Sequence, residues 1–535
     1  MKSIFRRQFL HLAGFALLLV LALLPASAQQ TTGSIAGTVK DQRDAVVNTA
    51  TIKATNVDTG LSRSAKVNGI GEFRIDNLPV GKYTVQADAA TFERFLQENL
   101  ALDVNQTLTL DIKLVVGAPD ITITVSEAPP QVNTSDAVLG RTIEQAEIIG
   151  LPLVNRNAYA ELSLTPGIMA NSAGPTSSTA ATPDFTVGLP STQVQVNGGL
   201  DSGNGTVGFY LDGGNNITGM RNYGNPAPNP DAIEEFRVDT NAFQAQYGQF
   251  SGAVVSVITK SGTNKYHGSL FEFNRNTDFN AYQWSIPAPT AKAPFHRNNF
   301  GGTFGGPIKH DKAFYFFSYA GLRQIQGTTV TGATVPTAAE RLGDFSADKA
   351  AGLTPIWMPG TYNSTTKTGT PVSGTNAGPG CGPGNTNTGY CIPQASLDTT
   401  ALNLTNVTNG LVNIPLAAPS AAITKTGGQS YGTIYNTPTD SNEYLGKFDD
   451  SYGNDHLGVT YFYINTKSTP SGGGNVNWTG VQSAATQMNI NLSDVHTFTA
   501  NVANQAWLTL TRAMGGRVMI PVAGPANQTL ASFGS

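Results

Sequence analysis

The chain has little charge and, beyond its first residues, no long apolar run. Only 13% of its 535 residues are charged, and the formal net charge is −4. This weak balance, with no basic cluster after the N-terminal leader, argues against a nucleic-acid partner. No run after residue 28 is long enough for a membrane helix. A membrane role would therefore require a β-barrel, the other spanning structure whose backbone groups are all paired.

The sequence also lacks the usual catalytic patterns. It contains no H-E-x-x-H pair, no G-x-S-x-G elbow and no P-loop. The adjacent carboxylates Glu234–Glu235 and Asp449–Asp450 would point to opposite faces of a strand. We therefore expect no enzyme, no catalytic residue and no cofactor.

Only two cysteines are present, Cys381 and Cys391, in the stretch GPGCGPGNTNTGYC. Two cysteines without a nearby histidine do not make a convincing metal site, so we expect no metal. In an exported protein they would form a local disulfide, with free thiols as the alternative.

The N-terminus indicates export. Lys2, Arg6 and Arg7 precede the apolar stretch Phe9–Leu24, and Ala26-Ser27-Ala28 forms an A-x-A cleavage site. Residues 1–28 are therefore interpreted as a signal peptide. Arg6-Arg7 also resembles a twin-arginine signal, but that route carries folded cargo and does not suit a barrel.

What the chain has in abundance is glycine and proline, at 58 and 30 residues, which suits a β-rich envelope protein with many turns. Alternating segments separated by turn signals predict an antiparallel β-sandwich over residues 29–116. The phrases GSIAGTVKD, ATIKATNVDTG and GEFRIDNLPVGKYTVQADAATF resemble the carboxypeptidase regulatory-like domain. The resemblance implies an accessory domain, acting either as a spacer or in sugar binding. The expected strands are Ser34–Lys40, Ala50–Asn56, Glu72–Ile75, Lys82–Ala87 and Thr107–Leu114.

The stretch Ile233–Thr263 is the most informative. It reads IEEFRVDTNAFQAQYGQFSGAVVSVITKSGT: an alternating strand, a Tyr-Gly turn and a β-branched run. It resembles the end of the plug domain of TonB-dependent outer-membrane receptors; the alternative is an ordinary hairpin of another secreted protein. The phrases TKSGTNKYHGSLFEFNRN, FGGTFGGPIKHDKAFYFFSYAGLR and VPTAAERLGDFS resemble the Oar-like branch. The resemblance implies a plug at 136–262, a barrel at 263–535 and a place in the outer membrane.

Two short segments carry the expected binding roles. In the linker 117–135, Thr122, Ile123, Thr124 and Val125 belong to an ITITV run that resembles a TonB box, which pairs with TonB by β-augmentation. The alternatives are a last sandwich strand or a plain linker. In the plug, the resemblance places the substrate near the loop that contains Asp212, Gly213, Asn215 and Asn216.

After Lys265 the chain predicts barrel strands. Leu457, Val459, Tyr461 and Tyr463 share one face of such a strand. Residues 346–440 are low in complexity and are interpreted as one surface loop, either a ligand-capturing loop or an unstructured insertion. Family barrels have about 22 strands, whereas this segment has room for about eight to ten. We therefore expect a chain that is truncated within its barrel.

Taken together, the expected fold class is mainly β: an N-terminal β-sandwich, an α+β plug domain, then a partial antiparallel transmembrane β-barrel. The expected function is a TonB-energised outer-membrane receptor. Its expected partners are the TonB complex of the inner membrane, outer-membrane lipid and an unknown small molecule, oligosaccharide or peptide. The alternative is a non-transporting surface protein with an adhesive or structural role.

Overall fold

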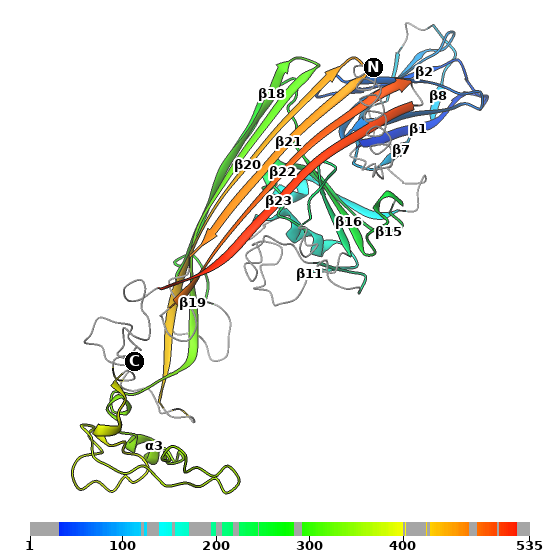
Figure 1. The fold of residues 1–535 in the computed structure, drawn as a ribbon. Coiled ribbons are helices and arrows are strands. Elements are labelled where there is room, and N and C mark those ends of the chain that lie inside the picture. The colour runs from blue at the N-terminus through cyan, green and yellow to red at the C-terminus, as the bar shows by residue number, and fades with distance from the viewer. Residues whose placement is uncertain are drawn as a thin grey trace, which may run out of the picture.

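The computed structural model shows a β-sandwich, a smaller sheet domain and a long antiparallel sheet (Figure 1). The described residues are 32–118, 122–125, 138–151, 156–170, 194–198, 206–217, 224–243, 245–282, 292–399, 402, 424, 428–469, 479–499 and 502–521. The expected signal peptide lies outside them. None of the helices in these segments has the length and apolar character needed to cross a bilayer.

The sandwich packs two sheets around a core that includes Ile35, Ile52, Leu78, Tyr83 and Leu100. Alternation along the strands places these side chains on the inner faces. One sheet contains β1 (Thr32–Asp41), β4 (Glu72–Pro79), β7 (Thr107–Thr109) and β8 (Ile112–Leu114). The other has the order β3-β2-β5-β6-β9, with β2 (Thr51–Asn56), β3 (Ser62–Lys66), β5 (Gly81–Asp88), β6 (Arg94–Leu102) and β9 (Thr122–Val125).

The strand expected at Thr107–Leu114 is instead two short strands, β7 and β8, which both pair in parallel with β1. The break falls at Asp111, whose carboxylate accepts hydrogen bonds from the backbone N–H (3.0 Å) and the hydroxyl (2.7 Å) of Thr38. Strands β3 and β6 were not expected. The sequence of β3, SRSAK, has almost no apolar alternation that could have indicated it.

The second domain, called the inner domain here, comprises the described residues between 138 and 262. Its main sheet has the order β10-β15-β16-β13-β14, and every residue of β16 is buried. The strands are β10 (Leu139–Glu144), β13 (Val207–Leu211), β14 (Gly214–Asn215), β15 (Ile233–Asn241) and β16 (Ala253–Thr259), with a separate pair β11 (Ile168–Ala170) and β12 (Val194–Val196). The short helices are α2 (Gln145–Gly150), η1 (Ala158–Leu164), η4 (Pro230–Ala232) and η5 (Ala245–Tyr247).

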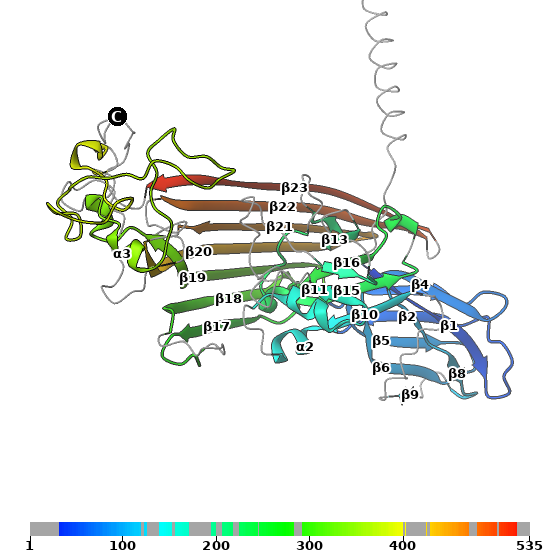
Figure 2. The same cartoon turned by 90° about the horizontal axis from the view of Figure 1, so that it is seen from below.

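The third part, called the wall here, is a seven-stranded antiparallel sheet in sequence order. The inner domain lies along one of its faces (Figure 2). The described residues of this segment form seven strands of the eight to ten expected. They are β17 (His267–Asn276), β18 (Phe295–Lys309), β19 (Ala313–Val335), β20 (Gln429–Tyr452), β21 (Asp455–Ser468), β22 (Thr479–Thr499) and β23 (Val502–Pro521).

The two ends of the wall differ. At one end the connections are short, at residues 310–312, 453–454 and 500–501, and the sandwich lies there (Figure 1). At the other end the connections are long, at residues 277–294, 336–428 and 469–478. We call these the short-turn end and the long-loop end.

The segment expected as one loop over 346–440 contains regular structure among its described residues. Residues 429–440 belong to β20, and residues 336–399 fold into a lobe at the long-loop end, called the tip lobe here. It contains η6 (Glu340–Leu342), α3 (Ser346–Ala350) and η7 (Gln394–Ser396). Cys381 and Cys391 form a disulfide within it, with an S–S distance of 2.00 Å. The interpretation as an unstructured insertion is therefore wrong for the described residues of the lobe.

Candidate functional site

The turn between β13 and β14 fixes the position of the expected substrate-loop residues. Asp212 and Gly213 both have left-handed backbones, with φ of 45° and 79°. An Asp-Gly pair suits this two-residue turn, because glycine has no side chain to clash and aspartate tolerates positive φ. Gly214 follows, and a Cβ there would lie 2.8 Å from the Thr509 hydroxyl of β23. The turn is therefore pressed against the wall.

The Asp212 carboxylate joins the inner domain to two wall strands. It accepts hydrogen bonds from the backbone N–H (2.9 Å) and hydroxyl (2.6 Å) of Thr259 at the end of β16. From the wall it accepts a hydrogen bond from the Thr460 hydroxyl (2.9 Å), and Lys447 Nζ lies 3.4 Å away. The side chains of Asp212 and Lys447 are only 9% and 12% exposed. A buried charge that keeps its counter-charge and hydrogen bonds is tolerated, whereas one left alone is costly.

Asn215 and Asn216 also contact the wall. The fully buried Asn216 accepts a hydrogen bond from the Gln487 amide (2.8 Å). The backbone carbonyl of Asn215 accepts from the Thr511 hydroxyl (2.6 Å) and the Asn489 amide (3.1 Å). The structure therefore places the expected substrate-loop residues on the inner face of the wall. Their role toward a substrate stays a prediction.

A second polar contact lies at Glu443 of β20. Its carboxylate accepts hydrogen bonds from the backbone N–H and the side-chain amide of Asn229, both at 2.7 Å. The same amide donates to Ser318 of β19 (2.9 Å). Beside it, Arg156 forms an ion pair with Asp231. The inner domain is thus attached to the wall at two clusters of buried polar groups.

The guanidinium of Arg156 also lies over two aromatic rings of β17. The distances from its central carbon to the ring centroids are 4.5 Å for Phe271 and 4.1 Å for Phe273. Such cation–π contacts add to the ion pair with Asp231. This is a further link between the inner domain and the wall, made to the strand at the opposite edge from β23.

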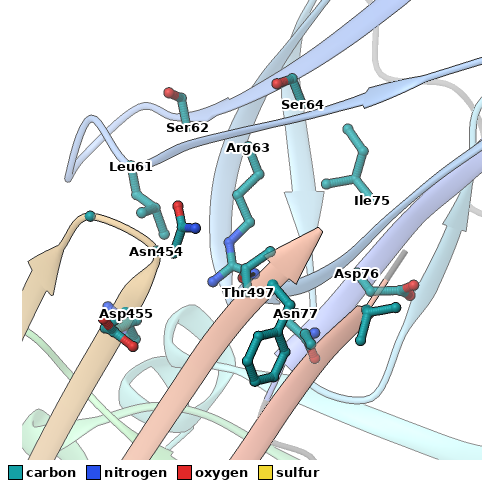
Figure 3. Close-up of a pocket in the computed structure, with 15 residues that line it drawn as sticks. Leu61, Ser62, Arg63, Ser64, Ile75, Asp76, Asn77, Asn454, Asp455 and Thr497 are labelled. Carbon is teal, nitrogen blue, oxygen red and sulfur yellow. Dashed lines mark hydrogen bonds between the residues drawn. The ribbon is translucent and has the colours of Figure 1, made fainter. Parts of the chain in front are cut away.

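The sandwich docks on the short-turn end of the wall (Figure 3). The Arg63 guanidinium on β3 donates to the Thr497 hydroxyl on β22 at 2.9 Å. Gln505 of β23 donates to Asn77, and the backbone N–H of Asn264 donates to the Asp58 carbonyl at 2.9 Å. A cavity of about 320 Å³ remains between the two surfaces. Apolar side chains from both surfaces, among them Leu61 of the sandwich and Phe498 and Val502 of the wall, also line this cavity.

The sandwich also contacts the inner domain, through its β6–β7 loop. The backbone N–H of Val104 donates to the Glu235 carboxyl group at 2.6 Å, and the Arg237 guanidinium lies 3.5 Å from the Val104 carbonyl. Burial, followed by the nearby Asp103 carboxyl group, raises the pKa of Glu235 to about 8. Glu235 is therefore a protonatable group within the sandwich–inner domain interface.

The candidate TonB-box residues Thr122, Ile123, Thr124 and Val125 form strand β9 at an edge of the sandwich. This strand pairs in parallel with β6, with Arg94 opposite Thr122 and Gln97 opposite Val125. The structure thus corresponds to the last-sandwich-strand alternative. Contact with TonB stays a prediction. It is compatible with this pairing, because an edge strand has a second side with which another strand can pair.

Sequence reasoning missed the wall residues that hold the inner domain. A signal was present: in QMNINL the polar residues Gln487, Asn489 and Asn491 alternate with apolar ones. Such alternation predicts a polar inner face and an apolar outer face. Glu443 and Lys447, four residues apart, likewise share one face of β20.

The cysteines offer no metal site. The Asp344 carboxylate lies beside both sulfur atoms, within a group of three potential ligands. Because the sulfurs are bonded to each other, neither is a thiolate that could bind a metal ion.

Comparison with known proteins agrees with this architecture. Residues 258–534 match the family model described as "Outer membrane beta barrel domain", and residues 34–115 match that of the "Carboxypeptidase regulatory-like domain". The "TonB-dependent transporter Oar" of Myxococcus xanthus is 25% identical over 304 residues, which cover 55% of this chain and 27% of that protein. The chain thus spans about a quarter of the length of this relative, which is a transporter and not an enzyme.

Two solved structures show the extent of the likeness. The siderophore receptor PiuA from Acinetobacter baumannii is 12% identical with a TM-score of 0.33, and the match covers 71% of this chain and 46% of that one. The alcaligin outer-membrane receptor FauA from Bordetella pertussis is 10% identical with a TM-score of 0.32, covering 73% and 49%. Because the barrel model matches more than half of its residues, the chain belongs to the outer-membrane β-barrel family, is located in the outer membrane, and is a homologue of the TonB-dependent transporter Oar.

Proposed function

We propose that the protein acts as a TonB-energised outer-membrane receptor, in which the inner domain is the plug. The substrate is an unidentified small molecule, oligosaccharide or peptide. The observation that carries the proposal is how the inner domain is held. Its polar contacts with the wall lie in two buried clusters around Asp212 and Glu443, beside a smaller apolar contact made by Phe316, Leu445 and Phe462 of the wall. Each such hydrogen bond contributes only about 1–3 kcal/mol net, so an applied force could break these contacts one after another.

The proposed division of the chain follows the same reasoning. Residues 29–116, extended by β9, are the periplasmic sandwich, residues 136–262 are the plug, and the segment from 263 onward is barrel. In barrels of this kind the short turns face the periplasm and the longer loops face outward. The short-turn end, where the sandwich docks, would then face TonB, and the tip lobe would face the medium.

The proposal is tested at β9. A photo-reactive amino acid is placed at Thr124, which is exposed on β9, and in a matched variant at Thr51, which is exposed on β2 of the same sheet. In living cells we expect a TonB adduct from position 124 and none from position 51. Equal adducts from both, or none from either, would contradict energisation through this segment. Deleting residues 121–125 is a poorer test, because the deletion also removes a sandwich strand.

A non-transporting adhesive role is the second candidate. The observation that favours it is the tip lobe, a folded, disulfide-bonded unit carried beyond the wall. If this role is correct, removing residues 337–427 should abolish attachment of cells to a surface or to each other. In that case no TonB adduct should form at position 124.

A further inference from the structure

The two edges of the five-stranded sandwich sheet face different surroundings. Its order is β3-β2-β5-β6-β9. Strand β3 is at the edge that docks on the wall, through the hydrogen bond from Arg63 to Thr497. Strand β9 is at the other edge, on the side of the sandwich away from β23 (Figure 2). The docked sandwich therefore leaves the β9 edge clear of the wall.

Strand β9 is packed as a true sandwich strand. Ile123 and Val125 are half-buried, and Val125 packs against the sandwich core, whereas Thr122 and Thr124 are exposed. The side-chain amide of Gln97 donates to the Val125 carbonyl at 3.1 Å, which fixes the end of the strand. If β9 were pulled away from β6, this apolar surface would be exposed and the backbone hydrogen bonds between the two strands would break at the same time. The pairing is therefore expected to persist when a partner binds elsewhere on the strand.

The second side of β9 is suited to accept another strand. In a parallel ladder a strand uses only part of its N–H and C=O groups toward one neighbour, and the others point away. Among the described strands, β6 is the one partner of β9. Natural edge strands usually carry a charged residue, most often lysine, or a proline, and either one blocks pairing with a further strand. The sequence Thr-Ile-Thr-Val has none of these.

We propose that TonB adds a strand to the open side of β9 while β9 remains paired with β6. A single sheet would then run from β3 at the wall, through β9, into TonB. This inference rests on the proposed function, and it specifies how the partner binds: the sandwich is part of the TonB-binding sheet. The two interpretations of the ITITV run, as a sandwich strand and as a TonB box, are then both correct.

The arrangement changes where a pulling force acts. A TonB box that left the sandwich would load the linker to the plug directly. If β9 stays in the sheet, the pulling force also acts on the sandwich. The sandwich passes this force to the contacts of Arg63 with Thr497 and of Val104 with Glu235. Undocking of the sandwich from the wall then becomes the first event of energisation.

A cross-link between β6 and β9 tests the proposal. Leu96 and Thr124 lie directly opposite each other on the outer face of the sheet. Adjacent strands are about 4.8 Å apart, within the Cα range for a disulfide. The full chain carrying Leu96→Cys and Thr124→Cys is purified with its new disulfide formed. Binding of the purified periplasmic domain of TonB is then compared with that of each single-cysteine variant, which cannot form this cross-link.

We expect the cross-linked protein to bind TonB with a Kd within about three-fold of the single variants. A loss of ten-fold or more in the cross-linked protein alone would overturn the inference, since it would mean that β9 must leave β6. Absence of binding by the wild-type chain and all variants is a different result and would refute the proposed TonB function itself.

Hydrogen exchange gives an independent measurement on the unmodified chain. If β9 stays in place, the amides of residues 94–97 on β6 should remain protected when TonB binds, and those of 122–125 should become more protected. Loss of protection at 94–97 in the complex would overturn the inference. No cysteine substitution is involved, so a folding defect cannot account for either outcome.

Discussion

Protonation of Glu235 should affect the contact between sandwich and inner domain, beside Asp103, whose pKa burial also raises. Burial and Asp103 raise its pKa to about 8, from an ordinary value of 4.5. The folded protein therefore holds a proton that the unfolded chain releases near pH 4.5. The resulting stabilisation is fully present below pH 4.5 and is lost as the pH rises through about 8. The folded state should thus weaken between pH 5 and 8.

The substitution Glu235→Gln tests this dependence, because glutamine mimics the protonated acid and cannot ionise. We expect wild type and variant to have similar Tm values at pH 5, and the variant to have the higher Tm at pH 8. Glu72, an exposed glutamate on β4 of the sandwich, supplies the matched control as Glu72→Gln. Parallel pH curves for wild type and Glu235→Gln would show that Glu235 does not control the contact.

The ion pair of Asp212 with Lys447 should contribute measurably to the attachment of the inner domain to the wall. Asp212→Asn leaves the buried Lys447 without this counter-charge, which costs about 3 kcal/mol in comparable buried pairs. We expect a corresponding fall in the free energy of unfolding measured in denaturant. Adding Lys447→Met should recover part of the loss, because both charges are then gone. If the two effects are simply additive, the pair is not coupled.

Among the elements, the tip lobe depends on its disulfide. The bond between Cys381 and Cys391 spans 10 residues, and closing a loop of this size stabilises a fold by about 2–3 kcal/mol. The double variant Cys381→Ser, Cys391→Ser should make residues 336–399 sensitive to added protease on intact cells. The wall should stay resistant, because its strands are paired along their length. Unchanged resistance of the lobe would mean that its other contacts are sufficient.

The elements also show how far the sequence alone could lead. The β-branched run of β16 and the alternation of β21 were predicted, because their periodicity is local. The division of residues 107–114 into β7 and β8 was not, because it depends on Asp111 reaching Thr38 across the sheet. The disulfide of the tip lobe was predicted, but the fold around it was not, since the low-complexity composition conceals the hydrogen bonds that hold the lobe. Contacts between distant residues leave little trace in a single sequence.

For the whole molecule, strand length sets the shape. Strands β19 and β20 have 23 and 24 residues, which at about 3.4 Å per residue is far longer than the apolar band of an outer-membrane barrel, about 25 Å tall. The pair must therefore project beyond the membrane. The tip lobe lies at the projecting end, opposite the sandwich (Figure 1). With the proposed orientation, the sandwich and the tip lobe would lie in different compartments.

The orientation can be tested with two matched lysines. Lys367 is exposed in the tip lobe, and Lys312 is exposed in the short turn between β18 and β19. Because short turns face the periplasm, Lys367→Cys should react with a membrane-impermeant maleimide on intact cells. Lys312→Cys should react only after the outer membrane is permeabilised. The native cysteines are joined in a disulfide and give no background. The reverse labelling pattern would show that the molecule has the opposite orientation. The sandwich would then lie outside the cell, beyond the reach of TonB.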